Sequence, residues 1–201
     1  MSNSNLLASN GVSLIAQDAV SRGPDSASTR WTEKLRNGTN VLIRPIDDGD
    51  VELERRFIEE LSAQSRRFRF LGSMKSASTE LLKQFTELDH ASEAAFVALL
   101  ADGEDQREIG VSRYSARVDG LSCECAVAVS DDWHNQGLGT LLMQHLIEVA
   151  RTHGIECMFS VDAADNVAMR DLAEHLGFQR KPDPNDATQV LHTLDLRAAT
   201  A

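Results

Sequence analysis

Two glycines, separated by one residue, stand between a strand pattern and a helix pattern. The segment 126–140 reads AVAVSDDWHNQGLGT, and Gly137-x-Gly139 leads directly into a helical repeat of apolar residues. The first backbone N–H groups of a helix have no partner within the helix, and the helix dipole makes that end positive. This arrangement suits a phosphate or pyrophosphate group. The glycines alone are weak evidence, because they would also permit a tight turn between strand and helix.

A glutamate, Glu124, lies on the strand pattern that precedes this loop, and a hairpin signal predicts its neighbours. Asp119-Gly120 stands between two alternating segments, at 108–117 and 122–130, and is a strong signal for a two-residue hairpin. In that hairpin Ser115 would lie opposite Glu124, with two arginines, at positions 113 and 117, diagonal to it on the same face. Residues 123, 125, 127 and 129 would point to the other face, toward the core. The alternative role of Glu124 is membership of a solvated Glu–Arg cluster.

The order of elements after the glycines resembles the GNAT superfamily of acetyl-CoA-dependent N-acetyltransferases. A second strand at 157–161 is followed by Asn166-x-x-Met169-x-x-Leu172 and by Leu176-Gly177-Phe178. The resemblance covers about residues 40–197 and is closest to the bacterial Pat-like protein lysine acetyltransferase domain. This closer likeness is carried by Arg44-Pro45-Ile46, Leu61-Ser62, the run from Ser65 to Phe70, Arg113-Tyr114 and Glu124-x-Ala126-Val127.

The resemblance implies that acetyl-CoA is the acetyl donor and indicates where it binds. The pyrophosphate would contact the loop 134–140, and strand amides just before it would hold the pantetheine and the thioester. Asn166 matches a family asparagine that contacts the cofactor, and it would serve equally well as a helix N-cap. The candidate cofactor-binding residues are Val127, Val129, His134, Asn135, Gln136, Gly137, Leu138, Gly139, Thr140 and Asn166.

The resemblance also implies a reaction. Glu124 matches the glutamate that Pat-like enzymes use as general base. A lysine amine has a pKa of about 10.4 in water, so a carboxylate must remove its proton, directly or through a water, as the amine attacks. Backbone donors would polarise the thioester carbonyl. We therefore expect direct transfer to a primary amine, preferably a protein lysine, without a covalent nucleophile; Cys125 as an acyl carrier is the alternative.

Two positions depart from the family pattern. The loop usually begins with Gln or Arg, and this chain has His134 there. Many members carry a tyrosine in the Asn-led helix that protonates the departing thiolate, and the matching residue is Ala173. Another group or solvent would then supply that proton. These departures keep open the alternative of a non-catalytic acyl-CoA-binding or sensing module. Acetylation of a small amine is a second alternative, because acceptor loops vary freely on a shared fold.

The remaining pattern predicts a single α/β domain with a mixed, mostly antiparallel central sheet flanked by helices. Further strands are expected at 40–46, 94–100 and 190–196, with helices at 47–70, 76–88, 138–153 and 166–176. Residues 1–30 are rich in Ser, Asn and Ala without periodicity. We therefore expect a flexible N-terminal arm over 1–38 and the acetyltransferase domain over 39–198.

The amino-acid composition of the chain argues against several classes of function. The net charge of −11 would repel nucleic acid and attract a cationic acceptor. No apolar run approaches the roughly 20 residues that cross a bilayer, and the apolar stretch 12–16 is too short for a signal peptide. Three cysteines, with a poorly spaced Cys123-x-Cys125 pair, favour free thiols over a disulfide or a metal site. We expect a cytoplasmic enzyme with no metal, nucleic-acid or membrane partner; the sequence leaves the oligomeric state open.

Overall fold

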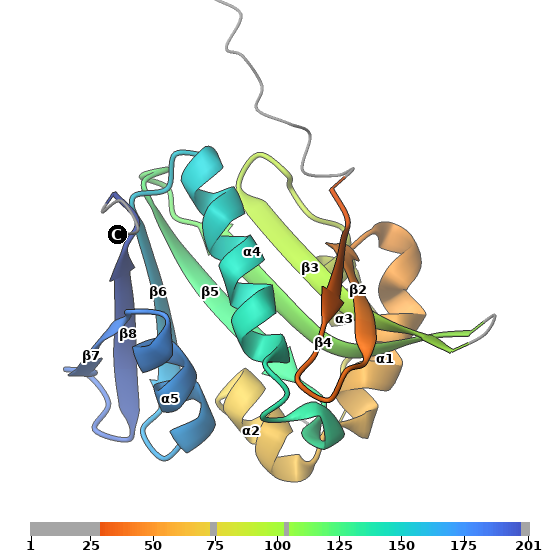
Figure 1. Ribbon diagram of the computed structural model, residues 1–201. Helices are drawn as coiled ribbons and strands as arrows, with labels where there is room; N and C mark the ends of the chain where they lie inside the picture. The colour runs from red at the N-terminus through yellow and green to blue at the C-terminus, as the bar shows by residue number, and fades with distance from the viewer. Residues whose placement is uncertain (1–28, 73–75, 103–104, 198–201) are drawn as a thin grey trace, which may run out of the picture.

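An eight-stranded sheet forms the centre of the molecule, with helices on both faces (Figure 1). The computed structural model describes residues 29–72, 76–102 and 105–197. In chain order the strands are β1 (Trp31–Lys34), β2 (Asn40–Pro45), β3 (Glu93–Asp102), β4 (Asp105–Ala116), β5 (Ser122–Val129), β6 (Cys157–Ala163), β7 (Gln179–Pro182) and β8 (Gln189–Asp195). The helices are α1 (Val51–Glu60), α2 (Ala63–Phe70), α3 (Thr79–Thr86), α4 (Leu138–Thr152) and α5 (Val167–His175), with 3-10 turns η2 (Asp48–Asp50) and η3 (Asp131–Trp133).

The sheet is mixed and mostly antiparallel, as the sequence predicted. Its strand order is β1-β2-β3-β4-β5-β6-β8-β7, and β5–β6 is the parallel pair in an otherwise antiparallel order. A parallel pair needs a crossover connection, and α4 provides it across the front of the sheet (Figure 1). The described residues therefore form one α/β domain.

The two faces of the sheet have separate cores. On the front, apolar residues of α4 such as Leu142 and Leu146 are fully buried against Phe96 and neighbouring strands. On the rear, Phe57 of α1 and Leu82 of α3 are buried against the opposite face. Because side chains alternate along a strand, β5 contributes its cysteines to the front and leaves Glu124 on the rear.

Close contact between α4 and the sheet depends on Gly110 of β4. A Cβ at this position would lie 3.0 Å from Leu142 Cδ1 and 3.2 Å from the Ala128 carbonyl oxygen. Ser112, on the same face, donates a hydrogen bond to the Leu142 carbonyl at 3.2 Å. These contacts fix the axis of α4, and therefore the position of its N-terminus, relative to β5.

The predicted hairpin is confirmed, and two other predictions of elements are corrected. Ser115 pairs with Glu124 across β4 and β5. The expected helix 47–70 is interrupted at Leu61, whose ψ of 142° is extended, and Ser62 then caps α2 by accepting a hydrogen bond from the Ser65 amide at 3.1 Å. The sheet also begins earlier than expected, because β1 lies inside the segment 1–38 that was expected to be an arm. Residues 1–28 of that segment lie outside the described residues.

The length and composition of a helix decide whether it could cross a membrane. The longest of the described helices, α4, has 15 residues and includes charged side chains. Within the described ranges, none of the helices combines the length and the apolar character needed to cross a bilayer.

Candidate active site

The parallel strands β5 and β6 pair over a short stretch and then separate. The paired positions run from Ser122↔Cys157 to Glu124↔Phe159. Both strands continue, to Val129 and Ala163, but within the described sheet they are not paired beyond Glu124. The edge of β5 that faces β6 is therefore open from Cys125 onward, and this open edge includes the predicted cofactor-binding positions Val127 and Val129.

The loop between β5 and α4 presents a run of unpaired backbone amides. Asn135 (φ 60°) and Gly137 (φ 88°) adopt left-handed conformations, and Gly137, as the N-cap of α4, has no side chain with which to cap the helix. The first amide with a backbone partner is that of Leu141, which donates to the Gly137 carbonyl at 3.1 Å. The amides of residues 135–140 have no acceptor among the described residues. Six such donors at a helix N-terminus fit an anion with several oxygens, such as a pyrophosphate.

His134, at the start of this loop, is held against β5. Its Nε2 lies 3.0 Å from the Val129 carbonyl oxygen. A carbonyl oxygen only accepts, so Nε2 must carry the hydrogen and donate it. The His134 backbone amide donates to the Asp131 carbonyl at 3.3 Å. His134 therefore fixes the exit of the chain from β5 into the loop.

Asn166 caps α5 at the far side of the gap. Its side-chain oxygen accepts a hydrogen bond from the Met169 amide at 3.1 Å. The N-cap role expected from the sequence is confirmed, whereas contact with a cofactor stays a prediction. Ala173, which stands where family members carry a tyrosine, is buried at 1% exposure.

Glu124 is exposed on the rear face, at the last position where β5 and β6 pair. The two arginines on the same face are engaged elsewhere. Arg113 lies 4.4 Å over the ring of Phe85 and donates to the Phe85 carbonyl, and Arg117 lies 5.3 Å over the ring of Phe159. Neither forms an ion pair with Glu124 in the described part of the chain. The arginines share the face predicted for them, and the role of Glu124 as a general base or as part of a solvated Glu–Arg cluster stays a prediction.

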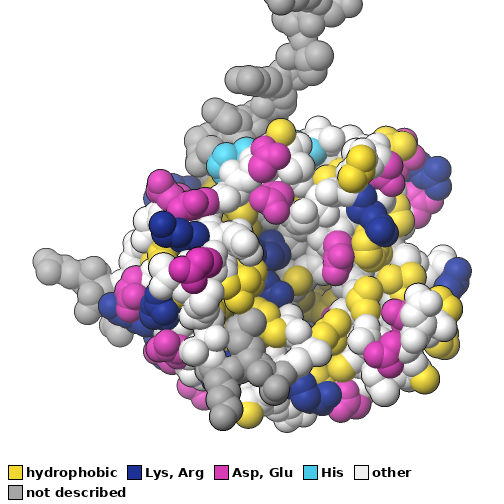
Figure 2. Space-filling model, turned by 180° about the vertical axis from the view of Figure 1, so that it is seen from behind, with side chains coloured by type: hydrophobic (Ala, Val, Ile, Leu, Met, Phe, Trp, Pro, Cys, Tyr) yellow, Lys and Arg dark blue, Asp and Glu magenta, His cyan; other side chains and the backbone are white. Residues whose placement is uncertain are grey.

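The rear face is hollowed between the side that carries α1 and α3 and the side that carries β6–β8 (Figure 2). Basic side chains are visible inside this hollow and acidic ones around it. Burial lowers the pKa of Arg113. Arg69, near the end of α2, has its pKa lowered to about 10 by burial and, in addition, by repulsion from the positive charge of Arg113.

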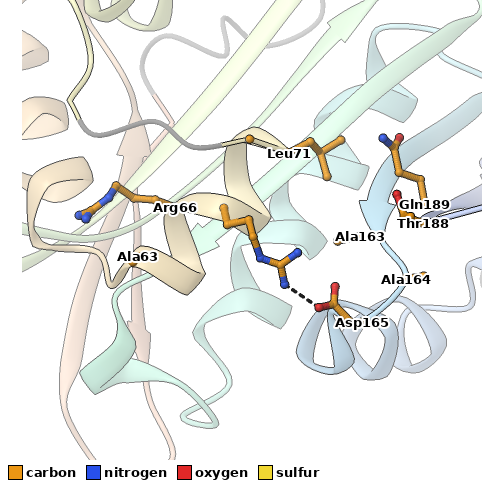
Figure 3. A pocket seen from close by; sticks show the side chains of 10 residues that line it. Ala63, Arg66, Leu71, Ala163, Ala164, Asp165, Thr188 and Gln189 are labelled. Atoms are coloured by element: carbon orange, nitrogen blue, oxygen red, sulfur yellow. Dashed lines mark hydrogen bonds and ion pairs between the residues drawn. The ribbon is translucent and has the colours of Figure 1, made fainter. Parts of the chain in front are cut away.

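A groove of about 890 Å³ lies beside α2, where β6 has separated from β5. One wall is formed by α2 and the two residues after it, and the other by Ala163–Asp165 and the start of β8. Arg67 and Asp165 form an ion pair of 2.6 Å between the two walls, whereas Arg66 points away and donates to carbonyls at the end of α1 (Figure 3). The open space thus follows the gap between the strands.

The model of the acetyltransferase (GNAT) family matches residues 57–178, which include the splayed strands, the amide-rich loop and α5. The chain belongs to the GNAT acetyltransferase family. The predicted GNAT resemblance is therefore confirmed, and the chain is an acetyl-CoA-dependent acetyltransferase.

This GNAT chain aligns with most of one curated relative and with less than half of another. It is 50% identical over 166 residues to "Acetyltransferase PA5475" of Pseudomonas aeruginosa, covering 83% of this chain and 89% of that protein. It is 30% identical over 145 residues to "Acetyltransferase Pat" of Mycolicibacterium smegmatis, covering 72% of this chain and 43% of Pat. The chain thus matches less than half the length of Pat.

Solved structures share the GNAT fold. The GNAT domain of S. lividans PAT superimposes with a TM-score of 0.75 at 24% identity, covering 83% of this chain and 96% of that domain. A cAMP-binding acyltransferase from Mycobacterium smegmatis gives a TM-score of 0.59 at 25% identity, over 84% of this chain and 47% of the other. These likenesses show the architecture and leave the acceptor open.

The cysteines of this GNAT domain are poorly suited to covalent catalysis. Cys123 and Cys125 are free and buried. Burial raises the pKa of Cys123 to about 12 and that of Cys125 well above its usual range. A neutral thiol is a weak nucleophile, so this environment argues against Cys125 as an acyl carrier. Across the described ranges, no group of three or more His, Cys, Asp or Glu residues is placed to hold a metal ion.

Sequence reasoning missed two residues that shape the GNAT site. Asp131 accepts hydrogen bonds from the Ser62 amide (2.9 Å), the Ser62 hydroxyl (2.8 Å) and the Ser65 hydroxyl (2.8 Å). It thereby ties the start of α2 to the turn before the loop. Arg36 contacts the loop itself. The serines of α2 signal a helix start, but no local pattern links them to Asp131 or links Arg36 to the loop.

Proposed function

We propose that this acetyltransferase transfers the acetyl group of acetyl-CoA to a lysine side chain of a protein, with Glu124 as the general base. The observation that carries the proposal is the place of Glu124. It is an exposed carboxylate at the pair where β5 and β6 separate, and it faces the hollowed rear of the sheet. A group at this position stands between the open strand edge and the face from which a large acceptor can approach.

The proposed binding of acetyl-CoA, the acetyl donor, rests on the unpaired backbone amides of the loop after β5. The CoA pyrophosphate would be bound by the N–H groups of 135–140, where the dipole of α4 adds positive potential. The pantetheine would follow the gap along the open edge of β5, next to Val127 and Val129. Asn166 would contact the pantetheine from the opposite side while it caps α5.

The chemistry follows from the charge state of the acceptor. A lysine amine is protonated at neutral pH and cannot attack until the proton is removed. Glu124 would accept that proton directly or through a water, and the nitrogen lone pair would then attack the thioester carbon. Backbone donors on the open edge of β5 would stabilise the oxyanion, after which the C–S bond breaks. The CoA thiolate takes a proton from solvent or another group, because Ala173 has none to give.

The shape of the rear face favours a protein acceptor over a small one. Glu124 lies on an exposed face and not at the end of a closed pocket. A lysine carried by a folded protein can therefore reach it without being enclosed. The net charge of −11 also favours a cationic acceptor at long range.

Thiol release from acetyl-CoA tests this proposal, with a lysine-containing protein mixture and a panel of small amines as acceptors. Glu124→Gln should lower turnover by roughly 100-fold or more and leave the Kd of CoA unchanged, because only the base is removed. Glu148→Gln is the matched control, since Glu148 is an exposed acid on α4. Preference for small amines would replace the proposed acceptor class, and CoA binding without transfer to any acceptor would favour a sensing module.

A further inference from the structure

We propose that Arg36 is a positioning residue for acetyl-CoA, because it holds the loop after β5 in the conformation that presents its amides to the pyrophosphate. The inference rests on the proposed binding of CoA at this loop. Arg36 belongs to the turn between β1 and β2, about a hundred residues away in the chain. It was expected to be part of a flexible arm, yet it contacts the loop in two places.

The contacts use both the backbone and the side chain of Arg36. Its backbone amide donates to the Gln136 carbonyl at 3.1 Å, and its Nη1 donates to the Asn135 carbonyl at 3.4 Å. The side chain also runs along Gly137, where an added Cβ would lie 3.7 Å from Arg36 Nε and 3.8 Å from Cγ. Two consecutive carbonyls of the loop are therefore hydrogen-bonded to one residue, whose side chain also passes beside the next residue, Gly137.

These contacts determine which way the amides point. In a trans peptide the C=O and the following N–H point in opposite directions. Because the carbonyls of Asn135 and Gln136 are directed at Arg36, the N–H groups of Gln136 and Gly137 are directed away from it. Those N–H groups are among the six that have no acceptor in the described ranges. Arg36 thus sits behind the loop, on the side opposite to the proposed anion.

The loop needs such support because its backbone is strained. Asn135 has a φ of 60°, which is uncommon for a residue other than glycine. A left-handed conformation of this kind persists when the surrounding structure holds it. The guanidinium of Arg36 also brings a permanent positive charge near the loop, which adds to the potential that attracts phosphate.

The hairpin that carries Arg36 is itself fixed to α4. Leu35 is buried at 3% exposure in the front core. Trp31 stacks on His145 of α4 with ring centroids 4.0 Å apart, and Glu33 Oε1 lies 2.9 Å from His145 Nε2. The hairpin that carries Arg36 is therefore packed against α4, the helix that follows the loop.

Calorimetric binding to three ligands tests the role of Arg36. The ligands are CoA, 3′-dephospho-CoA, which keeps the pyrophosphate, and pantetheine, which lacks it. Arg36→Ala keeps the backbone hydrogen bond to Gln136 and removes the side-chain contacts to Asn135 and Gly137. It should raise the Kd of CoA and of 3′-dephospho-CoA by about tenfold, as expected when a hydrogen bond from a charged group is lost. The Kd of pantetheine should change less than twofold. Arg36→Lys, which keeps the charge without the guanidinium, should fall between Arg36→Ala and the wild type.

Lys34→Ala is the matched control, because it removes a positive charge from the same hairpin at an exposed position; its Kd for CoA should stay within about twofold of the wild type. An unchanged CoA affinity in Arg36→Ala would overturn the inference. If Arg36→Ala lost as much affinity for pantetheine as it loses for CoA, the loss would be a general structural one. If only the affinity for CoA fell, Arg36 would act on the 3′-phosphate. Either result would also overturn the inference. Failure of the wild type to bind CoA would instead overturn the proposed function on which the inference rests.

Discussion

Glu124 and Phe159 form the last residue pair that joins β5 to β6. Beyond this pair the strands separate, and the open edge of β5 runs on toward the loop that precedes α4. The guanidinium of Arg117 lies over the ring of Phe159 and forms no ion pair with Glu124 in the described part of the chain, so the carboxylate remains exposed on the rear face. The candidate base and the gap that would receive the thioester therefore arise from the same feature of the sheet.

Gly137→Ala should weaken CoA binding about tenfold, because the φ of 88° at Gly137 sets the direction of the loop amides. An L-residue there costs about 1 kcal/mol of strain, and relief of that strain would rotate the donors. Gly154→Ala is the control: its φ is 80°, nothing lies within 4 Å of its added Cβ, and it stands at the other end of α4. Both variants should lose similar stability in thermal unfolding. Equal CoA affinities for the two would contradict the role of the loop.

Asp131→Asn should loosen α2, because it removes a carboxylate that accepts three hydrogen bonds from Ser62 and Ser65. Partial burial works against ionisation of Asp131, but these bonds outweigh it and lower its pKa below the usual 3.8. The charged form therefore stabilises the fold above pH 3.8, and this contribution is lost as the pH falls through the lowered pKa.

For this exposed group we expect a loss of about 1 kcal/mol in the free energy of unfolding at pH 7. The difference from the wild type should shrink as the pH falls below 3.8. Hydrogen exchange in α2 should become faster. Asp132→Asn, one residue along the same turn, should change neither the free energy of unfolding nor the hydrogen exchange of α2. An equal effect of the two variants would mean that the hydrogen bonds of Asp131 to Ser62 and Ser65 contribute nothing.

Cys125→Ala should keep kcat within about twofold of the wild type. The Cys125 thiol is buried and its raised pKa keeps it neutral, so direct attack of the amine needs no contribution from it. Intact-mass analysis after incubation with acetyl-CoA alone should show no acetyl group on Cys125. A stable adduct on Cys125, together with loss of turnover in the variant, would establish a covalent route.

Local patterns predicted the parts of the site that lie close together in the sequence. Asp119-Gly120 fixed the hairpin register, because a two-residue turn leaves one pairing, and that pairing placed Ser115 opposite Glu124. The glycines at 137 and 139 and the apolar repeat after them located the loop and α4. These features are set by turn chemistry and by the period of the apolar residues.

Contacts between distant segments could not be read in the same way. The strand β1 has four residues, WTEK, with little apolar alternation, and it is held by pairing with β2 and by Trp31 stacking on His145. The break at Leu61 could not be predicted from periodicity, because the apolar residues keep a helical spacing up to Leu61 itself. Neither Arg36 beside the loop nor Asp131 beside α2 leaves a local signal, since each acts on a segment that only the fold brings near.

The role of Glu124 as general base is tested most directly by the pH dependence of kcat, measured for the wild type and for Glu124→Gln at a saturating concentration of acceptor. Without a base, only the neutral amine reacts, so the rate of the variant should rise about tenfold per pH unit from pH 7 toward the amine pKa near 10.4. The wild type should rise much less, and the gap of about 100-fold at pH 7 should narrow steadily. Parallel profiles for the two proteins would contradict Glu124 as the general base.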